Sequence, residues 1–145
     1  MKTVMEIYLF ERFCRLGKNL FMKKVSFDFD KTLSKKEVQQ YAKMLIKEGV
    51  ECWIVTSRMG FGKEPRPDWN DDLFNTAAEI GILPEHIHFC CMDNKANFLN
   101  GKGFIWHLDD DLTELSFIKT DSDCKPISCF GNKTYLQECS YLLDL

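Results

Sequence analysis

The segment Lys24-Val25-Ser26-Phe27-Asp28-Phe29-Asp30-Lys31-Thr32-Leu33-Ser34 decides the fold of this chain. Apolar and polar residues alternate from Val25 to Asp30, and this period is typical of a strand. Side chains two apart on a strand point to the same side, so Asp28 and Asp30 would repel unless a cation lies between them. Mg²⁺ is commonly held by one or two carboxylates and by phosphate oxygens of a substrate. We therefore expect a strand whose carboxyl end carries a phosphate and metal site, rather than a simple turn and helix cap.

Strands and helices alternate along the rest of the chain. The patterns predict strands at 52–55, 86–91, 104–108 and 126–130, and helices at 35–48, 69–80, 95–100, 112–118 and 133–145. Ser34 is expected to cap the first of these helices and Gly49 to end it, while Trp69 is expected on the apolar face of the second. Strand, helix, strand order implies right-handed crossovers and a parallel sheet. The prediction is a doubly wound, Rossmann-like α/β fold with about five parallel strands and helices on both faces.

The chain divides into an N-terminal extension, 1–21, and a core domain, 22–145. The spacing of Met5, Tyr8, Leu9 and Phe13 predicts an amphipathic helix that ends at Gly17. Two interpretations stay open for this extension. It is either an added helix that packs on the sheet edge or on a partner, such as a second copy of the chain, or an artefact of the assigned start site.

Composition narrows the function classes. Hydrophobic residues make up 45% and charged residues 28% of the 145 residues, which indicates a globular domain rather than disorder. The net charge of −3 gives no overall attraction to polyanions, so any contact with nucleic acid would be local. No apolar run approaches the ~20 residues of a membrane span. The seven cysteines are odd in number and form no CxxC pair, so we expect reduced thiols in a cytoplasmic protein and no zinc site at Cys90, Cys91, His86 and His88.

Polar residues follow four of the predicted strands. They are Asp28 with Asp30, then Thr56, Lys95 and finally Asp109-Asp110. Ligands bind at the carboxyl edge of an open α/β sheet, so these groups are expected to converge. Each also has a plainer interpretation, namely a turn for Thr56-Ser57, a solvated lysine for Lys95 and a helix cap for the acidic run. His107 is expected to be a packed strand residue rather than a base.

Asp28-Phe29-Asp30-Lys31-Thr32-Leu33 resembles the first motif, DxDxT, of the haloacid dehalogenase (HAD) superfamily of phosphohydrolases. Thr56, Lys95 and the acidic pair match its second, third and fourth motifs in order, and the resemblance covers most of the chain from Lys23. Lys63 and Lys102 compete with Lys95 for the third motif. The position after the second aspartate is often glycine in this superfamily, whereas here it is Lys31, which we interpret as tuning the substrate.

The resemblance implies a Mg²⁺-dependent phosphatase. Asp28 would attack phosphorus and Asp30 would serve as general acid and base. Thr56, with the backbone of Ser57, would bind the phosphoryl oxygens, and Lys95 would neutralise charge. Asp109 and Asp110 would hold Mg²⁺ together with Asp28 and the backbone carbonyl of Asp30.

Many relatives carry an inserted cap domain, but 35–55 and 59–94 are occupied by predicted core elements and the 59–68 loop. We therefore expect a capless, open site that suits a large substrate, such as a nucleic-acid end or a phosphoprotein. Arg58, Lys63 and Arg66 would bind further phosphate at its mouth, with Trp69 stacking on a base. The plainer interpretation is a solvated loop with Trp69 in the core. The alternative function is a non-catalytic phosphate- or metal-binding module, such as a receiver-like signalling domain.

Overall fold

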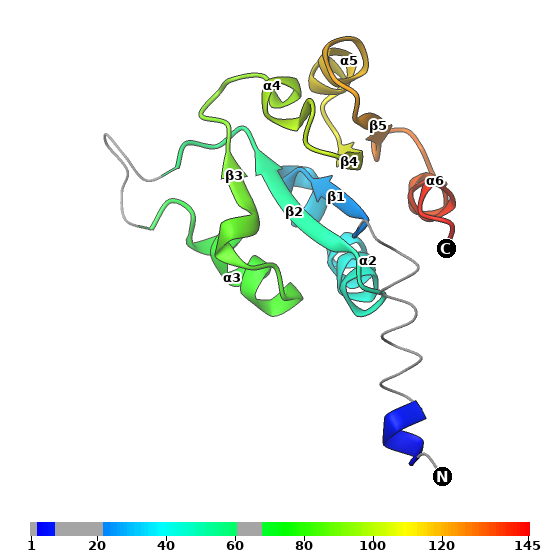
Figure 1. The fold of residues 1–145 in the computed structure, drawn as a ribbon. Coiled ribbons are helices and arrows are strands. Elements are labelled where there is room, and N and C mark those ends of the chain that lie inside the picture. Colours follow the sequence, from blue (N-terminus) through cyan, green and yellow to red (C-terminus); the bar gives the residue numbers. More distant parts are fainter. Residues whose placement is uncertain (1–2, 8–21, 61–67) are drawn as a thin grey trace.

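The structure is a computed structural model that describes residues 3–7, 22–60 and 68–145. Its centre is a five-stranded sheet in the order β3-β2-β1-β4-β5, in which every pairing is parallel (Figure 1). The strands are β1 (Lys24–Phe27), β2 (Glu51–Thr56), β3 (Ile87–Phe89), β4 (Phe104–Asp109) and β5 (Lys125–Ser128). The helices are α2 (Lys36–Lys47), α3 (Asp71–Ile80), α4 (Lys95–Leu99), α5 (Leu112–Asp121) and α6 (Tyr135–Leu142).

Helices cover both faces of the sheet, and each face has its own core. On one face α2, α3 and α6 contribute buried residues such as Leu45, Leu73 and Cys139 to a core that includes Phe27 and Trp106. On the other face α4 and α5 contribute Leu99 and Ile118 to a smaller core. The predicted α/β fold with a five-stranded parallel sheet and helices is confirmed.

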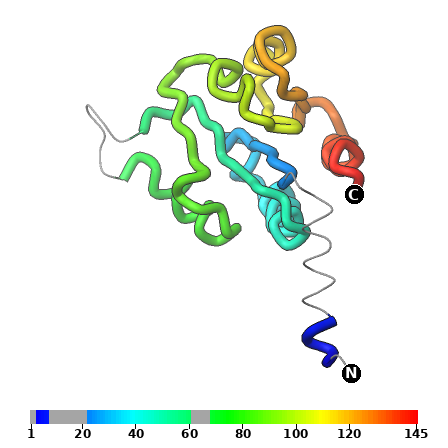
Figure 2. Tube along the Cα trace, viewed as in Figure 1, coloured from blue at the N-terminus to red at the C-terminus, as the bar shows by residue number. Residues whose placement is uncertain are grey.

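The order of the strands reverses beside β1. The chain runs outward from β1 to β2 and β3, then crosses through α4 to β4 on the other side of β1 and ends at β5 (Figure 2). The switch point therefore lies between β1 and β4, and ligands bind at the carboxyl edge of such a point. The backbone N–H of Asp28 donates to the carbonyl of Leu108 at 2.8 Å, which keeps the two strands together where the acidic residues begin.

The first strand is shorter than the alternation predicts. β1 ends at Phe27, and the next residues form a single turn, η1 (Phe29–Leu33). Within it Asp30 is extended and Lys31 is left-handed, with φ of 59°. The predicted Ser34 cap of α2 is also wrong, because Lys35 precedes the helix and the Ser34 hydroxyl instead accepts from the Lys31 N–H at 3.0 Å. Alternation in side-chain type cannot show where the backbone leaves the sheet.

Other predicted bounds shift by a few residues. A short 3₁₀ turn, η2 (Pro84–His86), precedes β3, which is therefore shorter than predicted, and α5 is longer. Trp69 does not lie on the apolar face of α3, since it precedes the helix and is 51% exposed. The apolar face of α3 consists instead of Leu73, Ala77 and Ile80.

Residues 4–7 form one helical turn, and the remainder of the predicted N-terminal helix lies outside the described residues. Each cysteine in the described ranges is a free thiol, and all of these except Cys91 are buried. Among the helices that the structure describes, none is both long and apolar enough to cross a bilayer.

Candidate active site

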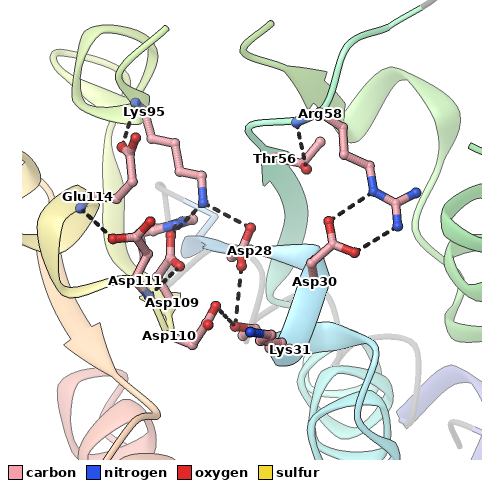
Figure 3. Close-up of polar contacts among 12 residues, drawn as sticks. Asp28, Asp30, Lys31, Thr56, Arg58, Lys95, Asp109, Asp110, Asp111 and Glu114 are labelled. Atoms are coloured by element: carbon pink, nitrogen blue, oxygen red, sulfur yellow. Dashed lines mark hydrogen bonds and ion pairs between the residues drawn. The ribbon is translucent and has the colours of Figure 1, made fainter. Parts of the chain in front are cut away.

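Asp28, Lys95 and Asp109 meet at the carboxyl ends of β1 and β4 (Figure 3). Asp28 follows β1, Asp109 is the last residue of β4, and Lys95 is the first residue of α4. The Lys95 ammonium donates to Asp28 Oδ1 at 2.9 Å and to Asp109 Oδ2 at 2.6 Å. All three residues are buried, and Lys95 is only 2% exposed. Burial removes water from the Lys95 ammonium, and hydrogen bonds to the two carboxylates replace that hydration. These two contacts fix the position of the ammonium.

A chain of buried hydrogen bonds runs from the carboxylate of Asp109 to His107 and on to Ser26. Asp109 Oδ2 lies 2.9 Å from His107 Nε2, and His107 Nδ1 lies 2.7 Å from Ser26 Oγ. A carboxylate can only accept, so Nε2 carries the proton and Nδ1 accepts from the Ser26 hydroxyl. Burial lowers the pKa of His107, which keeps the ring neutral. Asp109 Oδ1 accepts from the backbone N–H of Asp111 at 3.0 Å, so both oxygens are fixed.

The third carboxylate of this group is Asp110. Asp28, Asp109 and Asp110 each offer an oxygen within 4.8 Å of the others. The Thr32 hydroxyl lies 3.5 Å from Asp28 Oδ2 and 3.4 Å from Asp110 Oδ1, which links the turn after β1 to the end of β4. Mg²⁺ prefers oxygen ligands of this kind, so the donor set fits a divalent cation.

The charges of the site also fit a cation. Three acidic side chains gather around one ammonium, so negative charge would be left uncompensated if all three were ionised. Burial, together with the charge of Asp109, raises the pKa of the Asp28 carboxyl from its ordinary 3.8 to about 8. Burial alone would raise the pKa of Asp109 as well, but His107 and Lys95 outweigh it and lower this pKa. Below about pH 8 a proton therefore occupies Asp28 when no cation is bound. A divalent cation would displace this proton.

Asp30 does not join this group. Its carboxylate points away from Asp28 and toward Arg58 (Figure 3), whose guanidinium donates to Oδ1 at 2.7 Å and to Oδ2 at 2.9 Å. The backbone leaves the extended conformation at Phe29, where η1 begins, so the two aspartates diverge instead of sharing one side of a strand. Burial of Asp30 is slight, since its side chain is 56% exposed.

Thr56 is the last residue of β2 and is buried, and its Oγ1 accepts from the backbone N–H of Arg58 at 3.2 Å. This is the local turn that the plainer interpretation describes, and it leaves the hydroxyl proton of Thr56 available to an anion. Ser57 is partly exposed beside it. Lys63 and Arg66 lie outside the described residues. Lys102 does not compete with Lys95, because its ammonium bonds to the Phe98 carbonyl and lies 4.3 Å from the centre of the Phe98 ring.

Sequence reasoning missed several residues that support the site. The alternation puts Ser26 on the polar side of a strand and gives no sign of its bond to His107. Nothing in the sequence assigns a role to Glu114, although its Oε2 accepts from the backbone N–H of Lys95 at 3.1 Å. Nor does the sequence point to Asp72, which pairs with Arg58. Asp111 caps α5, accepting from Thr113 N–H and Glu114 N–H, so a helix cap does lie in the acidic run.

A scan of the sequence against models of known protein families finds no match, and a search of curated proteins finds no relative.

Proposed function

We propose that this chain is a Mg²⁺-dependent phosphatase that acts through an aspartyl-phosphate on Asp28. The observation that supports it best is the contact of one buried lysine with two carboxylates from adjacent parallel strands, Asp28 after β1 and Asp109 on β4. A phosphate monoester is a dianion that repels an anionic nucleophile, so a carboxylate reacts with it only where positive charge is concentrated. The resemblance of the Asp28–Leu33 segment to the first motif of the HAD superfamily adds to this argument.

In the first step an Asp28 oxygen forms a bond to phosphorus while the bond from phosphorus to the ester oxygen breaks. Asp30 gives its proton to the departing oxygen, so the alcohol leaves neutral. Lys95 stays charged throughout, because Asp28 and Asp109 raise its pKa despite the opposing effect of burial. Its ammonium is fixed by Asp109 at 2.6 Å while Asp28 changes from a carboxylate to an acyl phosphate.

In the second step water attacks phosphorus and the bond to Asp28 breaks, which restores the carboxylate and releases inorganic phosphate. Asp30, now ionised, accepts the proton of that water. Thr56 and the backbone N–H of Ser57, at the end of β2, would donate to the phosphoryl oxygens. Asp28, Asp109 and Asp110 would hold Mg²⁺, and when bound the ion withdraws negative charge from the phosphoryl group.

We further propose an open site that accepts a phosphomonoester on a large substrate, such as a nucleic-acid end or a phosphoprotein. A phosphatase screen with Mg²⁺ across sugar phosphates, nucleotides, oligonucleotide ends and phosphopeptides tests the class. Salt-sensitive hydrolysis of phosphorylated oligonucleotides without hydrolysis of free nucleotides would favour the nucleic-acid end.

The test of the mechanism is the Asp28→Asn variant. We expect it to lose all turnover of an aryl phosphate, with the Asp121→Asn variant on the exposed end of α5 as the matched control. At pH 7 the thermal unfolding of both variants should stay close to that of the wild type, because burial already favours the neutral form of Asp28. Full activity in Asp28→Asn would overturn the mechanism. A stable phosphoryl group on Asp28 without turnover would favour the signalling module instead.

A further inference from the structure

Arg58 is held between two carboxylates at the mouth of the site. Its guanidinium pairs with Asp30 through two hydrogen bonds of 2.7 and 2.9 Å, and with Asp72 through two more of 2.8 and 2.9 Å. Two-pronged pairs of this kind are the strongest geometry that arginine offers to a carboxylate. The arginine follows β2, whereas Asp72 belongs to the first turn of α3.

The pair with Arg58 sets what Asp30 can do in this arrangement. Both oxygens of Asp30 accept from a guanidinium that stays charged, and the side chain points away from Asp28 (Figure 3). A carboxylate whose two oxygens both accept from arginine cannot donate a proton to a leaving oxygen while that pair lasts. The structure therefore shows the proposed general acid held by Arg58 and, in that sense, withdrawn from the reaction.

Arg58 is positioned by contacts that do not involve Asp30. Its guanidinium carbon lies 4.9 Å from the centre of the Phe29 ring, and Asp72 binds it from the other side. The Trp69 carbonyl and Asn70 Oδ1 lie 3.5 Å from Nη1. If Asp30 moves away, Arg58 stays in place and presents two donors to the mouth of the site. Those donors suit a carboxylate, a sulfonate or a phosphate equally well.

The pair is open to solvent on the side of Asp30. The Arg58 side chain is 22% exposed and that of Asp30 is 56% exposed. Water can therefore hydrate Asp30 when it leaves the guanidinium, so that breaking the pair buries no unpaired carboxylate. An anion that brings its own binding energy can therefore displace Asp30 from Arg58.

We infer that Arg58 is a specificity-determining residue that keeps Asp30 withdrawn until a second anionic group of the substrate takes the place of Asp30 on the guanidinium. The substrate class is then a phosphomonoester that carries another anion at some distance from the reacting phosphate. This inference depends on the proposed function, because it assigns the role of acid to Asp30. It adds that the second anion, when it binds Arg58, releases Asp30 to act as the acid.

The test uses a series of alkyl monophosphates that end in a sulfonate, each compared with the hydroxyl-ended compound of the same length. The sulfonate supplies the second anion without adding a second hydrolysable phosphate. We expect the wild type to prefer the sulfonate at one chain length by about tenfold or more in kcat/KM, the scale of one charged hydrogen bond. Arg58→Met should lose the preference and Arg58→Lys should keep part of it, while Asp72→Asn should retain most of it.

The split between kcat and KM distinguishes release of Asp30 from a simple anion subsite. In the wild type the sulfonate should raise kcat, whereas in Asp30→Ala it should lower KM and leave kcat unchanged. A preference that lies in KM alone in the wild type, or that survives in Arg58→Met, overturns the inference. Equal activation by free propanesulfonate added to the hydroxyl-ended compound would also overturn it, because the anion would then be a separate effector.

The two proposals fail in different ways. If the wild type hydrolyses none of these phosphates, or if Asp28→Asn hydrolyses them, the proposed function fails. If Asp28 is required but the terminal anion has no effect at any chain length, only the role of Arg58 fails.

Discussion

At the scale of single residues, the most constrained atom of the site is Asp109 Oδ2. It accepts from Lys95 at 2.6 Å and from His107 at 2.9 Å, and all three side chains are buried. The ring of His107 also accepts from Ser26, so one imidazole connects β1 to the end of β4. We therefore propose that His107, whose ring is fully buried, is a positioning residue for the metal-binding carboxylate proposed at Asp109.

His107→Leu tests this role at nearly constant volume. The change leaves the Ser26 hydroxyl without its partner and removes one donor from Asp109, so we expect a loss of about 1–3 kcal/mol in the free energy of unfolding. The control is His86→Leu, since His86 is partly exposed, lies 3.8 Å from Glu51 and stacks on the Trp53 ring at 4.8 Å. Leucine keeps an apolar contact with Trp53 and the partly exposed ion pair contributes little, so the control should lose less than about 1 kcal/mol. Urea unfolding at pH 7 measures both, and equal effects would contradict the role.

The sequence predicted which residues belong to the site better than it predicted where their side chains point. Asp28, Lys95 and Asp109 could be found because each follows a strand pattern, and parallel strands present their carboxyl ends to one edge. The sequence also indicates Asp30, but it does not indicate that Asp30 pairs with Arg58. The direction of the Asp30 side chain depends on where the backbone leaves the strand, and Phe29, where the turn begins, fits the alternation of the strand equally well.

At the scale of elements, the turn after β1 separates the two aspartates. Lys31 has φ of 59°, a conformation that costs a residue with a Cβ atom roughly 1–2 kcal/mol. Glycine adopts it readily, so a glycine at this position would avoid the cost. The conformation gives position 31 a role in the backbone, which differs from the tuning of the substrate that the sequence suggests.

Substitutions at Lys31 test the cost of the turn. We expect Lys31→Val to lower the free energy of unfolding by about 1–2 kcal/mol, because a β-branched residue fits left-handed backbone poorly. Lys31→Gly should be neutral or stabilising by up to about 1 kcal/mol, since its greater unfolded-state entropy offsets part of the gain. Lys35→Val is the control, because Lys35 is extended, with φ of −84° and ψ of 138°. A larger loss at Lys35 than at Lys31 would contradict the account.

The alternation of elements was predictable because each strand and helix carries its own period of apolar residues. The burial of Val38, Tyr41, Ala42 and Leu45 on α2 follows that period. Bounds were harder, since the end of β1 and the start of α3 are set by turns rather than by side-chain type. Trp69 was misplaced for this reason, because an aromatic residue next to a helix pattern resembles a member of its apolar face.

At the scale of the whole molecule, the acidic site couples folding to pH. The pKa of Asp28 is raised from 3.8 to about 8, so between these pH values the folded chain holds a proton that the unfolded chain releases. This contribution to stability is fully present below pH 4 and is lost as the pH rises through 8. The lowered pKa of Asp109 acts in the opposite sense and only below about pH 4, so the two windows do not overlap.

Thermal unfolding at pH 5 and pH 8 measures this linkage. In the presence of a chelator we expect the contribution of Asp28 to lower Tm at pH 8 relative to pH 5. Mg²⁺ should raise Tm more at pH 8 than at pH 5, because at pH 5 it must displace the proton. Asp28→Asn should remove most of the difference between the two pH values. A Mg²⁺ effect that is equal at both pH values, or that persists in the variant, would contradict a cation site at Asp28.

The most direct test of the central claim is to trap the phosphorylated carboxylate. Asp30→Asn supplied with Mg²⁺ and a nitrophenyl phosphate should still release the phenolate, which needs no acid, but should hydrolyse the enzyme intermediate slowly for want of a base. After an acid quench, mass spectrometry of peptides should place a phosphoryl group on Asp28, and the variant that also carries Asp28→Asn should show none. Phenolate release with no phosphoryl group on the protein, or with that group on another residue, would contradict the account.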